Sequence, residues 1–271
     1  MRNRLRCAII HFMKRGLSFF EGMPHPAIIA HRGASVEAPE NTLAAFRLAV
    51  DLGAHAIELD AKLSADGEIV VMHDDTVDRT TNGHGRVKDI RLNDLKKLDA
   101  GVNHDGNFHG EQIPTLAEVF TAVGGQTMIN VELTNYSSPF DDLPLRVVEL
   151  IPQYHIEERI LFSSFNPIAL YRAGRAFPEI SRALLISRGS AALWKRGWMM
   201  IKALGCQAVH AALGDVNPDF VRQMHNNNLR VQVYTVNGRV DLKRMIEADV
   251  DGIFTDDVRL AKEIVSAGGE R

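Results

Sequence analysis

Residues 27–53 read AIIAHRGASVEAPENTLAAFRLAVDLG, a segment that holds one complete strand and helix unit. The apolar run 27–30 predicts a buried strand. Residues 39–42 carry a Pro-Glu-Asn-Thr sequence typical of a capped helix start, and the apolar stripe that follows ends at Gly53, a common helix stop. The segment therefore predicts a strand followed by a crossover helix.

The same unit recurs along the chain. Further strands are expected at 56–60, 128–133, 160–163, 182–186, 207–210, 231–235 and 252–255, and further helices at 116–123, 145–151, 167–177, 191–204, 219–227 and 240–248. Alternating strands and helices indicate a parallel sheet. Eight strands in 271 residues fit the roughly 250 residues of an α/β TIM (β/α)₈ barrel. We expect a single barrel domain over 27–271, preceded by an extension over 1–26.

One strand-like run does not fit the alternation. Residues 69–72 follow the second strand after only the short segment 64–68, which leaves no room for a crossover helix. Asp66-Gly67 is a strong hairpin signal, so this run is expected to pair antiparallel with the second strand. We expect a small inserted subdomain at about 61–110. Loops at strand C-termini build the active sites of such barrels, so chemistry is expected nearby.

Composition and charge restrict the class of protein. The chain is 45% hydrophobic and 24% charged, as globular proteins are, and its net charge of -3 offers no cation excess, so no nucleic-acid partner is expected. Cys7 and Cys206 have neither disulfide-scaffold nor zinc spacing, and His104 and His109 lack partner ligands at suitable spacing. The cysteine usage fits a reducing compartment, and we expect a cytoplasmic protein.

Two segments suggest contact with a membrane surface without crossing it. No run approaches the eighteen or so apolar residues of a membrane span, and segment 1–26 lacks the features of a secretory signal. This segment is basic and amphipathic, so it either packs on the barrel floor or touches anionic lipid. Trp194 and Trp198, four apart, either pack against neighbouring helices or form a lipid-facing patch.

Acidic side chains gather on two of the expected strands. Glu58 and Asp60 lie two apart, so both side chains point toward the barrel axis. On the next strand Asn130, Glu132 and Thr134 share a face by the same alternation. Neighbouring carboxylates remain ionised together when a cation lies between them, and hard oxygen ligands favour Mg²⁺ or Ca²⁺. The alternative is an ordinary acid pair on a solvated strand.

Two histidines end strands beside these carboxylates. His31 follows the first strand and precedes Arg32-Gly33, where glycine permits a close turn and arginine can hold a phosphate oxygen. His73 ends the return run of the hairpin. A lone histidine is usually a surface or capping residue. Imidazole exchanges a proton near neutral pH, however, so two of them across a phosphorus centre could divide the acid and base roles.

The motifs that contain these residues resemble a known family. In order they are 29–34 (IAHRGA), 39–43 (PENTL), 58–60 (ELD), 66–67 (DG), 73–74 (HD) and 78–83 (DRTTNG), with weaker matches at 113–116, 130–132, 163–166, 234–237 and 255–256. Their order and spacing resemble the glycerophosphodiester phosphodiesterase family from about residue 27 to residue 258. A series of ordered motifs is far more specific than any one of them.

The resemblance implies a TIM barrel with an insertion after strand two, and an activity. The family hydrolyses glycerophosphodiesters to sn-glycerol 3-phosphate and an alcohol. By position, His31 and His73 would be the catalytic acid/base pair and Arg32 a phosphate contact. The attacking group is either water or the substrate's own glycerol hydroxyl, and both routes need the same residues.

The resemblance also implies a cofactor. Glu58, Asp60 and Glu132 would bind one divalent cation, Mg²⁺ or Ca²⁺, with Mn²⁺ as a further candidate. Apart from the resemblance, we expect Phe165 and Tyr234 to line the pocket wall for the leaving alcohol. The expected partner is therefore a small glycerophosphodiester.

The chain departs from the family pattern at two informative positions. Thr134 stands where the family usually has lysine, which removes a cation that would face the substrate phosphate. Arg32, or a basic side chain from the insertion such as Arg79 or Arg86, is a candidate substitute. Tyr234 replaces a more common tryptophan and keeps an aromatic wall.

Two other functions remain open on the sequence. The basic extension and Trp194/Trp198 would suit a lysophospholipase D that acts on monoacyl lipids as a peripheral protein at a membrane surface. The loss of lysine at Thr134 would suit a catalytically silent barrel that binds phosphorylated ligands.

Overall fold

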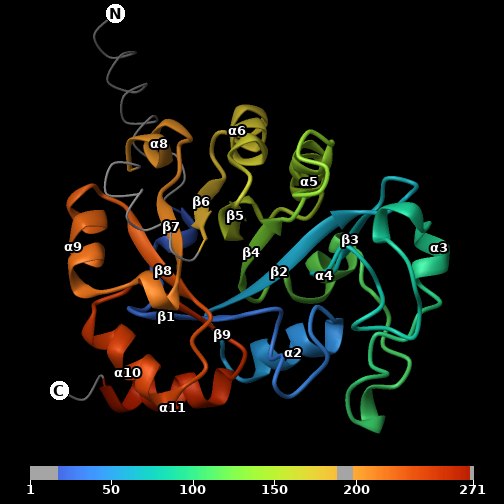
Figure 1. The fold of residues 1–271 in the computed structure, drawn as a ribbon, viewed down its shortest axis with the longest axis horizontal. Coiled ribbons are helices and arrows are strands. Elements are labelled where there is room, and N and C mark those ends of the chain that lie inside the picture. The colour runs from blue at the N-terminus through green and yellow to red at the C-terminus, as the bar shows by residue number, and fades with distance from the viewer. Residues whose placement is uncertain (1–17, 188–197, 269–271) are drawn as a thin grey trace, which may run out of the picture.

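Eight parallel strands close into a barrel in the computed structural model, which describes residues 18–187 and 198–268 (Figure 1). The barrel strands are β1 (Ala27–Ala30), β2 (Ala56–Leu63), β4 (Met128–Leu133), β5 (Ile160–Ser164), β6 (Ser181–Ile186), β7 (Ala208–Ala212), β8 (Arg230–Tyr234) and β9 (Gly252–Thr255). β1 pairs in parallel with both β2 and β9, which closes the sheet. The TIM-barrel prediction is confirmed.

Helices follow the strands and cover the outside of the barrel (Figure 1). They are α2 (Leu43–Asp51), α4 (Leu116–Val123), α5 (Leu143–Leu150), α6 (Pro167–Ala176), α8 (Trp198–Ala203), α9 (Pro218–Asn226), α10 (Arg239–Glu247) and α11 (Val258–Gly268). Thr42 begins α2, because its hydroxyl oxygen accepts a hydrogen bond from the Ala45 N–H at 3.2 Å. Of the predicted helix 191–204 the structure describes only the part that contains α8.

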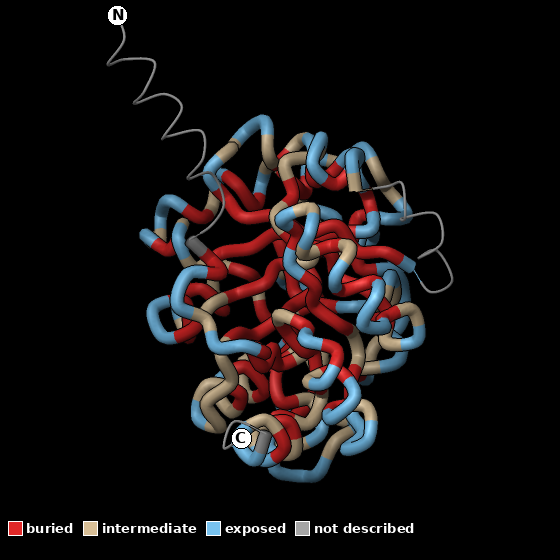
Figure 2. Tube along the Cα trace, turned by 90° about the vertical axis from the view of Figure 1, so that its left-hand side faces the viewer, coloured by how far each residue is buried: buried red, intermediate tan, exposed pale blue. Residues whose placement is uncertain are grey.

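The alternation of side chains along the strands separates an outer from an inner layer. Outward-facing residues such as Ile57 and Leu59 pack beneath the helices in the main hydrophobic cluster. Inward-facing residues such as Ala56 and Leu161 fill the barrel interior. Figure 2 shows this buried interior surrounded by exposed loops and helix surfaces. Glu58, which lies between Ile57 and Leu59, therefore faces the barrel axis.

Two phenylalanines close the end of the barrel where the strands begin. Phe19 and Phe20 lie in the short helix η1 (Ser18–Phe20) and are buried in the same cluster as Ile29 and Ala56. Their own rings meet edge to face, with centroids 5.2 Å apart. The described part of the N-terminal extension thus packs on the barrel floor. Its arginine-rich start lies outside the described residues.

The insertion after β2 has a small hydrophobic core of its own. β3 (Ile69–Val71) pairs antiparallel with β2, as the Asp66-Gly67 turn predicts. The short helices η2 (Val87–Asp89), α3 (Leu92–Leu95) and η3 (Gly106–Phe108) follow it. The core of the insertion consists of Val70, Met72, Val77, Val87, Leu95, Ala100 and Ile113. This cluster gives the residues that follow β3 a packed support beside the barrel (Figure 1).

The tryptophan pair is described in part. Trp198 is half-buried and packs against the main cluster, and the Lys202 ammonium lies 5.5 Å from its ring centre. Trp194 lies outside the described residues. Within 18–187 and 198–268, no helix has both the length and the apolar character required to cross a bilayer.

Candidate active site

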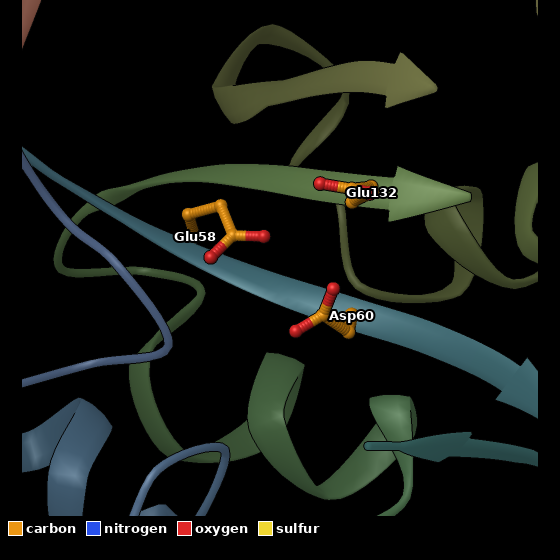
Figure 3. A group of neighbouring side chains, drawn as sticks. All are labelled: Glu58, Asp60 and Glu132. Carbon is orange, nitrogen blue, oxygen red and sulfur yellow. The ribbon is translucent and has the colours of Figure 1, made fainter. Parts of the chain in front are cut away.

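Three carboxylates converge where β2 and β4 run side by side (Figure 3). Glu58 and Asp60 lie on β2 and Glu132 on β4, and the strand register sets Asp60 opposite Glu132. One carboxylate oxygen of each residue lies within 4.8 Å of the other two. The structure thus brings the three predicted ligands together, and this group of hard oxygen donors could hold a metal ion.

Burial dominates the electrostatics of the two glutamates in this group. Desolvation, followed by repulsion from the neighbouring acids, raises the pKa of Glu58 well above its usual value and that of Glu132 to about 8. A hydrogen bond from Tyr136 and the charges of Arg32 and Lys62 oppose the shift at Glu132. The raised pKa values favour the protonated forms of Glu58 and Glu132, whereas a bound cation would favour their ionised forms.

Two residues that the sequence did not single out as functional hold these carboxylates in place. The Asn41 amide donates to Asp60 Oδ2 at 2.9 Å, and the Tyr136 hydroxyl donates to Glu132 Oε1 at 2.6 Å. Asn41 has a φ of 58°, which turns its side chain back toward β2 before α2 begins. Tyr136 follows the end of β4, where no strand periodicity could reveal its direction.

His31 is oriented by an aspartate from the far end of the chain. Its Nδ1 lies 2.7 Å from Asp256 Oδ1, and Asp256 also accepts hydrogen bonds from Ser35 and Asn237. Burial would raise the pKa of Asp256, but these contacts, that with His31 first, hold it below its usual value. Because an ionised carboxylate can only accept, the proton of a neutral His31 lies on Nδ1 and leaves Nε2 as an acceptor.

His73 has a similar partner, but within the insertion. Its Nδ1 lies 2.7 Å from Oδ1 of Asp74, the next residue in the chain. Arg79 donates to both oxygens of Asp74 and to both oxygens of Glu40. The hydrogen bonds from Arg79 lower the pKa of Asp74 to about 2. Arg79, one predicted substitute for the missing lysine, is thus engaged in orienting His73 through Asp74.

Arg32 lies among the acidic groups at the end of β1. Its backbone N–H donates to Glu58 Oε2 at 3.0 Å, its guanidinium donates to Glu40 at 3.0 Å, and its Nε lies 3.4 Å from Asp60 Oδ2. The turn requires Gly33, which has a φ of 87° and whose added Cβ would lie 2.7 Å from the backbone of α2. The guanidinium is therefore held at the carboxylate cluster.

One cavity at the C-terminal ends of the strands unites these groups. Seven of the eight predicted site residues line it: His31, Arg32, Glu58, His73, Glu132, Phe165 and Tyr234. Asp60, the eighth, is buried and reaches the cavity through its contact with the other carboxylates. Five further lining residues were not predicted to take part: Asn130, Leu185, His210, Thr235 and Phe254.

Known proteins are similar to this chain in sequence and in fold. A family model described as the glycerophosphoryl diester phosphodiesterase family matches residues 31–260. The chain belongs to this family. A glycerophosphodiester phosphodiesterase of Caldanaerobacter subterraneus is 40% identical over 89% of this chain and 98% of its own length, and a Bos taurus enzyme, glycerophosphodiester phosphodiesterase 1, is 30% identical over 91% and 82%.

Solved structures of the family have a similar fold. An Oleispira antarctica phosphodiesterase, in complex with the product sn-glycerol 3-phosphate, superimposes with a TM-score of 0.84 at 31% identity, covering 89% of this chain and 97% of its own. A glycerophosphodiester phosphodiesterase from Agrobacterium tumefaciens gives 0.77 at 28%, covering 88% and 99%. Membership makes the protein a phosphodiesterase, and the resemblance found from the motifs is confirmed.

The expected position of Thr134 needs correction. β4 ends at Leu133, so strand alternation does not extend to Thr134, and its hydroxyl donates to the Ala61 carbonyl at 2.7 Å. Thr134 lines a neighbouring cavity together with Lys62 and Arg86 rather than the cavity of the two histidines. Lys62, two residues beyond Asp60, donates to the Thr134 carbonyl at 3.2 Å. β2 thus brings the buried cation of Lys62 to this position, whereas the sequence expectation considers only Arg32 and the basic residues of the insertion.

Aromatic rings form one side of the cavity mouth. Phe165 packs edge to face on Tyr136 and on Tyr234, with ring centres 5.7 and 6.2 Å apart. The Tyr234 hydroxyl donates to the Ile186 carbonyl at 2.8 Å, so its ring is fixed against the barrel. Phe165 is more than one-third exposed and offers an apolar surface at the entrance.

Proposed function

We propose that the protein hydrolyses glycerophosphodiesters to sn-glycerol 3-phosphate and an alcohol, with one divalent cation and with His31 and His73 as the acid/base pair. One observation carries the proposal. Two histidines, each with a carboxylate on Nδ1, line the same cavity as Glu58 and Glu132. This set supports turnover rather than silent binding, because a binding barrel would not need two oriented proton-exchanging groups.

The two histidines suit the two proton transfers of phosphodiester cleavage. A new P–O bond forms to the attacking oxygen, which gives up a proton, and the P–O bond to the alcohol breaks as that oxygen gains one. Asp256 and Asp74 hold Nδ1 of the respective rings, so Nε2 of each ring is the atom available for exchange. One imidazole must begin neutral and the other protonated. Both routes of attack, by water or by the glycerol hydroxyl, require this division.

Glu58, Asp60 and Glu132 would hold the cation. Their three oxygen donors fit a hard ion such as Mg²⁺, Ca²⁺ or Mn²⁺, and two of the acids have raised pKa values that a cation would reverse. When bound, the ion would polarise the phosphoryl oxygens and stabilise the charge that develops on them. Arg32, which lies beside the same carboxylates, would contact the phosphate.

A substrate panel with and without chelator tests the proposal. We expect glycerophosphocholine and glycerophosphoethanolamine to yield sn-glycerol 3-phosphate with Mg²⁺ or Ca²⁺, and no turnover with excess chelator. Lysophosphatidylcholine provides the comparison for lysophospholipase D activity. Full activity in chelator would refute the role of the cation, and binding of sn-glycerol 3-phosphate without any turnover would favour the silent barrel.

A further inference from the structure

A buried histidine lies at the inner end of the active-site cavity. His210 lies on the face of β7 that points into the barrel. It lines the same cavity as His31 and Glu132. It is 0% exposed, and neither ring nitrogen makes a hydrogen bond of good geometry among the described residues, although Gln232 stands opposite it on β8. Its ring packs on Phe254 with centres 4.8 Å apart, which fixes the ring plane.

A second polar group at the cavity shares this property. Asn130 on β4 stands opposite Glu58 in the strand register, is 1% exposed, and lines the cavity. Its Oδ1 has no partner among the described residues. Buried polar atoms without partners cost folding free energy, so folded proteins pair them with protein, water or ligand. Two such groups in one functional cavity indicate a site for a polar ligand.

The protonation state of His210 defines what it can bind. Burial lowers the pKa of His210 to about 3, against an opposing contribution from the neighbouring Gln232 side chain, so the ring is neutral at physiological pH. A neutral imidazole offers one N–H donor and one acceptor nitrogen, and Asn130 Oδ1 offers an acceptor. A hydroxyl group both donates and accepts. A polyol therefore matches this inner end better than an anion, which could use only the single donor.

We propose that His210, with Asn130, binds the glycerol hydroxyl groups of the substrate and determines specificity for the glycerol half. This rests on the proposed function. Glycerol then occupies the inner end of the cavity, with its phosphate at the carboxylates and the leaving alcohol toward the exposed Phe165. In this orientation the glycerol half is recognised by buried polar groups, whereas the alcohol meets an open apolar mouth.

Direct binding tests the proposal independently of turnover. Calorimetry with Mg²⁺ would compare sn-glycerol 3-phosphate with n-propyl phosphate, which lacks both hydroxyl groups. The wild type should prefer the glycerol ligand by about 10- to 100-fold. His210→Leu should lose most of that preference, while n-propyl phosphate binding changes by less than about threefold. His210→Gln, which keeps a donor and an acceptor, should restore part of it.

His104→Leu is the matched control. His104 also has an unpartnered buried Nδ1 and packs edge to face on Phe108, but it lies in the insertion and does not line the cavity. This variant should keep the wild-type preference. A wild type without preference, or a folded His210→Leu that retains it, would overturn the proposal.

A measurement on the wild type covers the case in which His210→Leu does not fold. The ring nitrogen resonances of His210 should shift on addition of sn-glycerol 3-phosphate and not on addition of inorganic phosphate. Equal responses to the two ligands would overturn the proposal. If instead the preference is present but no phosphodiester is hydrolysed, the proposed function fails while the glycerol site stands.

Discussion

The two histidines of the site have the same kind of partner but different supports. His31 lies at the end of a barrel strand, and its Asp256 follows β9, 225 residues along the chain. His73 belongs to the insertion, and its Asp74 is its sequence neighbour. The His31 side chain is 19% exposed and that of His73 43%. One imidazole therefore lies at the end of a strand of the closed sheet, and the other is supported by the small core of the insertion.

A single carboxylate links the two supports. Glu40, just before α2, accepts from Arg32 on the barrel side and from Arg79 on the insertion side. These contacts hold the pKa of Glu40 below its usual value despite its burial. The difference between the histidines indicates that the barrel positions the three carboxylates and one imidazole, while the insertion brings the second imidazole to the same cavity.

Removal of either imidazole should have the largest effect. We expect His31→Ala and His73→Ala each to reduce kcat by about 10²- to 10⁴-fold, because each deletes one proton transfer. Steady-state rates on glycerophosphocholine, with circular dichroism as a control for folding, measure this. Near-wild-type activity in either variant would contradict the assignment of that histidine.

The orienting aspartates should separate the two histidines. Asp256→Asn and Asp74→Asn each keep the shape but lose the charge that fixes Nδ1–H, and we expect losses of about 10- to 100-fold in kcat. The loss should be larger for Asp256, since its imidazole is the less exposed. Asp256→Asn should also change the pH profile of kcat, whereas the loss of a purely structural contact would leave that profile unaltered. Equal losses would remove the distinction between the two supports.

The carboxylates between the histidines should make cation binding depend on pH. In metal-free protein the pKa values of Glu58 and Glu132 are raised, for Glu132 from 4.5 to about 8. Between these two pH values the folded state binds more protons than the unfolded state, so the free energy of unfolding decreases as the pH rises. A cation removes this cost. The gain in Tm on adding Mg²⁺ should therefore be larger at pH 8 than at pH 5.5, by several degrees.

Glu132→Gln provides the control for this dependence. It replaces an acid that titrates in the window with an amide that does not, so the Mg²⁺-dependent gain in Tm should shrink and vary less with pH. Scanning fluorimetry in chelator and in Mg²⁺ measures both. An equal gain at the two pH values in the wild type would count against the carboxylate site.

Arg79→Lys should have the smallest effect. Lysine keeps the charge but cannot bridge both oxygens of Asp74 and of Glu40, so His73 should be held less firmly while His31 is unaffected. We expect a decrease of about two- to fivefold in kcat and little change in Tm, because the guanidinium is about half exposed. A loss as large as that of His73→Ala would mean that Arg79 itself contacts the substrate.

Local periodicity in the sequence determined which side chains share a face of each strand. Alternation along β2 sufficed to place Glu58 and Asp60 on one face, since the pleat depends only on the strand itself. The hairpin turn likewise predicted the insertion. The same rule failed at Thr134, because β4 ends one residue earlier and the alternation ends with it.

Tertiary structure alone decided how these pieces meet. The pairing of His31 with Asp256 exists because β1 closes on β9, and the contacts of Tyr136 with Glu132 and of Lys62 with the Thr134 carbonyl depend on where loops and neighbouring strands lie. Whether the His210 ring nitrogens find hydrogen-bond partners depends on the other side chains inside the barrel. A sequence specifies the direction of a side chain within its strand, whereas its partners depend on how the whole sheet closes.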